Sequence, residues 1–210
     1  MTLLSYFQSV RERRRDGDRG AALVELALAI PLFILLMAAI FDFGGGFRSA
    51  EDSSAAVRSA ARAAALSGNE RVADFRAIQS IRSQLAASND SIAWMTIYRS
   101  PASGDGSVPV DCLPGTSGAV GVCNVYDGPQ IAALTSSSFT DQSCLGEPDA
   151  NWCPTTRDDG TDDLIGVAVW TSHDPTIGLF GGSQDWEIAE SAVFALFFPD
   201  LPPESAPAAS

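Results

Sequence analysis

The sequence contains no lysine and a single histidine, His173, so it offers little for acid–base or metal chemistry. It has no G-x-S-x-G, HExxH or phosphate-binding glycine motif, and the absence of a CxxC pair argues against a zinc site. Asp174 follows His173, but this pair without a placed nucleophile does not make a catalytic site. His173 is therefore expected to be an exposed loop residue at a strand end, and we predict no catalytic, cofactor-binding or metal-binding residue.

Basic residues are almost absent from the second half of the chain. Residues 90–210 contain 17 acidic residues against only Arg99 and Arg157. This charge repels nucleic acid and anionic lipid, so a nucleic-acid partner is not expected. Residues 1–20 instead contain five arginines against three acidic residues and flank a long apolar run. The positive-inside rule then predicts a cytoplasmic N-terminus, with the rest of the chain outside.

Cysteine is missing from the first 111 residues. The four cysteines all lie in the part expected to be outside: Cys112, Cys123, Cys144 and Cys153. An even number in an exported segment favours two disulfides, with three possible connectivities. We favour Cys112–Cys123 and Cys144–Cys153, because both would close short local loops. Four reduced, buried thiols are the alternative.

The apolar run extends from Ala21 to Phe41 and contains one charged residue, Glu25. As a helix it would be about 31 Å long, which matches the hydrocarbon core of a bilayer. A charge within a membrane costs about 2.5–3.5 kcal/mol at its centre, so Glu25 is expected to be functional. A cleaved secretory signal is disfavoured because residues 42–48 make a poor cleavage site. A plain membrane anchor fits the length but leaves Glu25 unexplained.

A third interpretation accounts for Glu25. The segment from Gly20 to Glu25, with the sequence GAALVE, resembles the processing site of type IV pilin-like precursors. The resemblance implies that a membrane peptidase cuts between Gly20 and Ala21 on the cytoplasmic side and leaves the apolar helix in the membrane. Glu25 would then hold the family's glutamate position. Where subunits pack side by side, Glu25 would neutralise the new Ala21 ammonium of a neighbour and set the axial register.

The resemblance extends over residues 19–66. The segment 19–28 with Pro31, the segment 40–44 and the alanine-rich segment 55–65 resemble the TadE-like family of minor pilins, or pseudopilins, of Tad-type tight-adherence pilus systems. Leu26 stands where the family often has an aromatic residue. The resemblance implies a single-pass inner-membrane protein of the bacterial cell envelope that acts in pilus assembly. The implied partners are the membrane, a prepilin peptidase, other pilin subunits and the Tad secretion machinery.

Two other functions stay open at this point. The first is a single-pass membrane anchor with an outer ligand-binding domain and no assembly role. The second is an exported enzyme, which would require activity in residues 68–210 that depends on His173.

The predicted fold class is α+β and pilin-like, with a long N-terminal helix that continues into a small antiparallel sheet domain. The expected parts are a cleaved, disordered leader (1–20), a helix (21–66, membrane-spanning over 21–41), an extracytoplasmic domain (67–201) and a disordered tail (202–210). Within the helix, Pro31 predicts a kink, and Gly44–Gly46 predicts either a hinge or a break.

Periodicity predicts the elements of the outer domain. A helix with one apolar stripe is expected over Glu70–Ala87. The expected strands are Ser91–Arg99, Ala119–Tyr126, Leu164–Thr171 and Glu187–Phe197, with a helix as the alternative for the last. In the first strand, alternation places Ile92 and Trp94 on one face and Met95 on the other. Residues 135–163 are expected to be a long polar loop held by disulfides. The four carboxylates within 158–163 are expected to be a solvated acidic turn, with a calcium site as the alternative.

Overall fold

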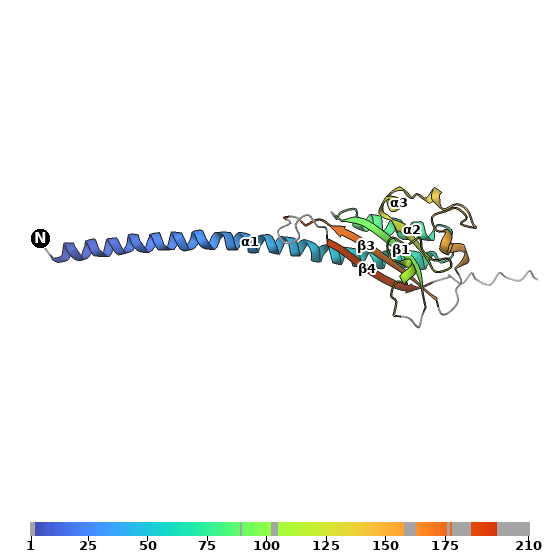
Figure 1. Ribbon diagram of the computed structural model, residues 1–210, viewed down its shortest axis with the longest axis horizontal. Helices are drawn as coiled ribbons and strands as arrows, with labels where there is room; N and C mark the ends of the chain where they lie inside the picture. Colours follow the sequence, from blue (N-terminus) through green and yellow to red (C-terminus); the bar gives the residue numbers. More distant parts are fainter. Residues whose placement is uncertain are drawn as a thin grey trace, which may run out of the picture.

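The computed structural model describes residues 3–88, 90–101, 105–157, 163–175, 177 and 186–196, with residues 3–19 described by their backbone alone. One helix, α1 (Leu3–Ser67), projects far beyond an α+β domain that is built on its C-terminal third (Figure 1). The helix is continuous through Pro31 and through Gly44–Gly46, so the predicted break at the glycines is wrong. It also includes residues 3–20, which the sequence analysis expected to be disordered.

The outer domain is a four-stranded antiparallel sheet in the order β2-β1-β3-β4. Its strands are β1 (Ser91–Pro101), β2 (Cys123–Asp127), β3 (Asp163–His173) and β4 (Trp186–Ala195). This arrangement confirms the predicted fold class and every predicted strand, although β2 begins four residues late. The helix α2 (Ala73–Leu85) is also confirmed and is slightly shorter than expected.

Both long helices pack on one face of the sheet. Alternate residues of the central strands, such as Met95 and Val167, lie in a core with Val57 of α1 and Ile78 of α2. Alanine dominates the buried side of α1, which lets the helix axis approach the strands closely. The apolar stripe predicted for α2 is the face that closes this core.

The opposite face of the sheet is covered by the segment 105–122. Tyr98 and Ala168 pack there against the buried disulfide Cys112–Cys123. The second disulfide, Cys144–Cys153, holds the long loop after β2. These are the two pairs that the sequence analysis favoured.

Three local features differ from the predictions. A β-bulge between Ile92 and Trp94 places Ile92 against the helix-side core, whereas strict alternation placed it on the same face as Trp94. The short helix α3 (Gly128–Ala133) was not predicted. The loop expected over residues 135–163 contains three short 3₁₀ turns: Ser136–Ser138, Ala150–Trp152 and Pro154–Thr156.

Candidate functional site

The N-terminal half of the segment Gly20–Ser67 of α1, which we call the apolar half, has apolar side chains that are exposed almost all around the helix. Within the described residues, one helical segment, Gly20–Ser67, is long and apolar enough to cross a membrane, and almost none of its apolar stretch is buried in the chain. Its exposed large apolar residues are Leu23, Val24, Leu26, Leu28, Ile30, Leu32, Phe33, Ile34, Leu35, Leu36, Met37, Ile40, Phe41, Phe43 and Phe47. Each would gain about 1.5–3 kcal/mol by leaving water. Such a surface is typical of a membrane anchor or a signal segment.

Glu25 is the one charge in this surface. It is exposed and forms no hydrogen bond or ion pair within the part of the chain that the structure describes. Gly20 and Ala21 are exposed as well, one helical turn before Glu25, or about 6 Å along the axis. The structure places these three residues close together on one accessible stretch of α1 and, within the described residues, brings no other predicted site residue to them. The four cysteines lie in the outer domain.

The C-terminal half of the segment Gly20–Ser67, which we call the seated half, packs on the sheet through small residues. A Cβ atom at Gly46 would lie far inside van der Waals distance of the Trp186 ring, and one at Gly45 would lie 3.3 Å from Nε2 of His173. One and two turns further on, Ser49 and Ser53 are buried, and Ser53 hydrogen-bonds Thr171 across a distance of 3.1 Å. Two glycines of the Gly44–Gly46 run therefore permit the base of the sheet to approach the helix.

The opposite side of this half carries a stripe at helical spacing. We call it the outer stripe, and it consists of Phe47, Glu51, Arg58, Arg62 and Leu66. Phe47 is 73% exposed and Leu66 is 55% exposed. The three charged residues between them are exposed and form no ion pair within the described residues. The outer stripe also lines two shallow hollows of about 470 and 430 Å³ between α1 and the edge strand β4.

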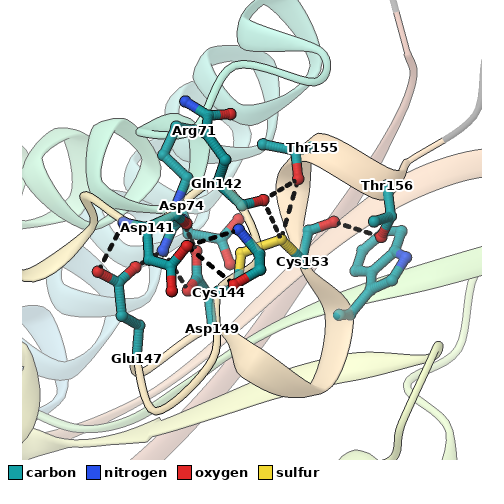
Figure 2. The surroundings of a disulfide bond; sticks show 12 residues. Arg71, Asp74, Asp141, Gln142, Cys144, Glu147, Asp149, Cys153, Thr155 and Thr156 are labelled. Atoms are coloured by element: carbon teal, nitrogen blue, oxygen red, sulfur yellow. Dashed lines mark hydrogen bonds and ion pairs between the residues drawn. A yellow bond between two sulfur atoms is a disulfide. The ribbon is translucent and has the colours of Figure 1, made fainter.

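A buried charge network joins α2 to the loop of the second disulfide (Figure 2). Arg71 donates to both carboxylate oxygens of Asp149, the longer bond measuring 3.0 Å, and also contacts Glu147. Burial raises the pKa of the Asp149 carboxyl, although the hydrogen bonds from Arg71 oppose this shift. The network fixes the position of the loop that carries Cys144 and Cys153.

A second part of the network is centred on Asp74 of α2. Asp74 Oδ2 accepts hydrogen bonds from Asn124 and from the Tyr126 hydroxyl, each at 2.8 Å, and Oδ1 lies 2.7 Å from Nη2 of Arg157. Arg157 also stacks over the Trp152 ring, 4.1 Å from its centroid. Burial, together with the negative charge of Asp74, raises the pKa of Tyr126 well above its usual value. These contacts stabilise the fold, and sequence analysis did not identify them.

His173 is not the exposed loop residue that the sequence suggested. It is buried at the end of β3, and its Nδ1 lies 2.6 Å from Oδ1 of Asp90, a residue 83 positions away. Asp174, its sequence neighbour, was therefore the wrong partner to consider. Trp152 lies in the core, Trp170 packs beside the first disulfide cluster, and Trp186 contacts Phe43.

The structure gives no support for a metal site in the residues it describes, which contain no cluster of three histidine, cysteine or acidic side chains suited to an ion. The acidic segment 158–163, considered as a calcium site, lies outside the described residues apart from the backbone of Asp163. The tail 202–210 also lies outside them.

Comparison with protein families gives a match that falls on the helix described above. Residues 20–65 match the model of the family described as TadE-like protein. Over this segment the chain is similar to the TadE-like family. The match begins at Gly20 and ends two residues before α1 does, so the TadE-like segment consists of the exposed apolar half and the seated half of one helix. Searches of curated proteins and of solved structures returned no significant match.

Proposed function

We propose that this protein is a minor pilin, or pseudopilin, of a Tad-type pilus that is inserted in the inner membrane and acts in pilus assembly. The observation that carries the proposal is the coincidence of the TadE-like match with a helical segment, Gly20–Ser67, whose N-terminal half is apolar and almost wholly exposed. The TadE-like family implies association with the Tad pilus system and is not known to be catalytic. The outer domain would lie on the extracytoplasmic side, where two disulfides are stable.

Processing between Gly20 and Ala21 is the first step of this proposal. Both residues are accessible at the end of the apolar segment that would meet the cytoplasmic membrane face. A prepilin peptidase would remove residues 1–20 and leave an ammonium on Ala21. The arginines of the removed segment would hold the precursor in the correct orientation until then.

Glu25 would then serve as the assembly residue. In lipid, an unpaired carboxylate is strongly disfavoured, and an opposite charge on an adjoining subunit would relieve this cost. A neighbouring pilin subunit with a free N-terminal ammonium supplies such a charge. The apolar side chains around Glu25 would remain in contact with lipid before assembly and with neighbouring helices after it.

N-terminal sequencing of the protein recovered from membranes of its own host tests the processing step. We expect Ala21 as the first residue, and we expect Gly20→Val to leave the precursor uncut, because the bulky side chain stands at the bond to be broken. Gly44→Ala, which places a methyl group in open space on the same helix, is the matched control and should be cut normally. A protein that retains Met1 would be an anchored outer domain, and a protein that begins after residue 41 would be a secreted one. Either result would refute the proposal.

A further inference from the structure

A polar pocket lies at the base of the outer domain, between α1 and the end of α2. Its volume is about 450 Å³, and its lining includes Gly45, Ser49 and Asp52 of α1 together with Asp90 and His173. Arg48 stands at its rim with a side chain that is 85% exposed. Neither the TadE-like match nor the proposed assembly role assigns a function to this pocket.

Three buried polar atoms of the pocket-lining residues have no hydrogen-bond partner within the part of the chain that the structure describes: Ser49 Oγ, Asp90 Oδ2 and His173 Nε2. The Asp90 side chain is only 1% exposed, and the His173 side chain is 10% exposed. A buried polar group without a partner costs free energy, so three of them around one pocket indicate a group that pairs with them.

The chemistry of the three atoms selects that group. His173 Nδ1 lies 2.6 Å from Oδ1 of Asp90 and donates to it, and with a proton on Nδ1 alone the Nε2 atom is an acceptor. Asp90 Oδ2 is an acceptor too, and a hydroxyl such as that of Ser49 can also accept. The pocket therefore suits a compact donor of several hydrogen bonds. A primary ammonium has three N–H donors, whereas a quaternary ammonium has none.

The charged residues around the pocket also favour a cationic ligand. Two carboxylates, Asp52 and Asp90, line the pocket, and the one arginine at the rim is drawn outward, 3.8 Å from Asp52. A ligand with an ammonium at one end and a phosphate at the other would meet the carboxylate inside and Arg48 outside.

The position of the pocket indicates the source of this ligand. Gly45 lies four residues beyond Phe41, or about 6 Å along the helix, which is roughly the depth of one headgroup layer. Phe43 and Phe47 are exposed on either side of Gly45 and extend the apolar surface to this level. We infer that the pocket binds the primary ammonium of a phosphoethanolamine lipid headgroup. This inference goes beyond the proposed function, since it requires the membrane anchor but no pilus.

Native mass spectrometry of the full chain in detergent, with equimolar phosphatidylethanolamine and phosphatidylcholine of the same acyl chains, tests the inference. We expect wild-type protein to retain phosphatidylethanolamine at least fivefold over phosphatidylcholine. Ser49→Ala removes one acceptor with little change in shape, and Asp90→Asn removes the charge; each should reduce this preference to near onefold. Asp111→Asn removes an exposed carboxylate far from the pocket in sequence and should preserve the preference. Near-UV circular dichroism checks that each variant is folded.

Two results would overturn the inference. Equal retention of both lipids by wild-type protein would show that the protein does not select a primary ammonium. An unchanged lipid preference in both Ser49→Ala and Asp90→Asn would show that the selectivity arises outside this pocket. Soluble phosphoethanolamine at millimolar concentration serves as a third arm. If it displaces the lipid completely, the site takes a free amine and the lipid assignment is wrong, whereas retention of the lipid supports it.

Discussion

At the scale of single residues, the carboxylate of Asp74 joins three separate parts of the outer domain. From α2 it accepts hydrogen bonds from Asn124 and Tyr126 of β2 and pairs with Arg157 of the following loop. Both partners of the ion pair are fully buried. Burying such an ion pair costs desolvation free energy. Removing only one of its two partners destabilises the protein more, because the other charge is left buried and unpaired.

Replacement of Asp74 by asparagine should therefore destabilise the protein by about 3–5 kcal/mol, since the Arg157 charge would remain buried without an anion. Asp111→Asn, at an exposed site, should change stability by less than about 0.5 kcal/mol. Denaturant unfolding of the full chain in detergent, followed by near-UV circular dichroism, measures both. Equal stability of the two variants would show that the Asp74 network contributes little.

Tyr126 gives the network a pH dependence. Its pKa in the folded protein is raised well above the usual value of about 10 by burial and by the negative charge of Asp74. The folded state therefore holds this proton more tightly than the unfolded state does. The resulting stabilisation is complete below about pH 10 and is lost progressively as the pH rises above that value. Stability measured from pH 8 to 11.5 should fall above pH 10, and Tyr126→Phe should flatten this fall; an identical fall in the variant would assign it to other groups.

At the scale of secondary-structure elements, the packing of α1 against the sheet depends on which positions of the helix have no side chain. Gly46 lies directly under the Trp186 ring, whereas the Cβ position of Gly44 has no neighbour within 4 Å. The same substitution at these two positions should therefore have opposite effects. Gly46→Ala should destabilise the outer domain by about 1–3 kcal/mol through overpacking. Gly44→Ala should stabilise the helix by up to about 1 kcal/mol.

Thermal unfolding of the two full-length variants in detergent measures this difference. The melting temperature should fall for Gly46→Ala and stay constant or rise for Gly44→Ala. A similar change in both variants would mean that the glycines serve as a hinge, as one interpretation of the sequence proposed, and not as a seat.

The elements themselves were largely predictable because their signals are local. The spacing of Phe75, Ile78 and Ile81 predicted α2, and strand alternation predicted β1, β3 and β4. The short helix α3 had a usable signal that was missed: Asp127 caps it, and Gln130 returns the hydrogen bond in a capping box.

Other features depend on contacts that no local pattern contains. His173 and Asp90 are 83 positions apart, and the β-bulge beside Ile92 reversed the face on which that side chain was expected. The partners of Asp74 come from β2 and from the loop after the second disulfide, so they become apparent only after the sheet has formed. The candidate site does not depend on such long-range contacts. Gly20, Ala21 and Glu25 are close in sequence on one helix, so their proximity could be predicted from the sequence alone.

At the scale of the whole molecule, α1 offers two successive surfaces to a neighbouring copy. The apolar half would be anchored in the membrane, so two copies must pack with their helices parallel. In the seated half, the outer stripe carries Glu51 seven residues before Arg58, and neither forms an ion pair within the described residues. If two parallel helices packed without an axial shift, Glu51 would face Glu51 and Arg58 would face Arg58, so like charges would repel. A shift of seven residues, about 10 Å, would oppose Glu51 of one copy to Arg58 of the next. The same shift would leave Glu25 of the next copy about 4.5 Å along the axis from Ala21 of the first, within reach of a carboxylate–ammonium pair.

Engineered cysteines test this axial shift. In cells that express Glu51→Cys and Arg58→Cys copies together, oxidation should give a mixed crosslinked dimer in the membrane fraction. Each variant expressed alone should give at least fivefold less. Predominant crosslinking of Glu51→Cys with itself would contradict the shift and indicate an unshifted pair. The native cysteines form two internal disulfides, so they do not compete.

The central claim is that Glu25 is retained in the apolar helix because it pairs with a neighbouring subunit. Its most direct test compares the fraction of Glu25→Gln protein in sheared pilus material with that of wild type in the original host. Leu28→Gln, which adds the same amide nearby while Glu25 remains, is the control. We predict at least a tenfold loss of incorporation for Glu25→Gln and near-normal incorporation for Leu28→Gln. Equal incorporation of Glu25→Gln and wild type, with normal trimming at Gly20, would contradict the claim.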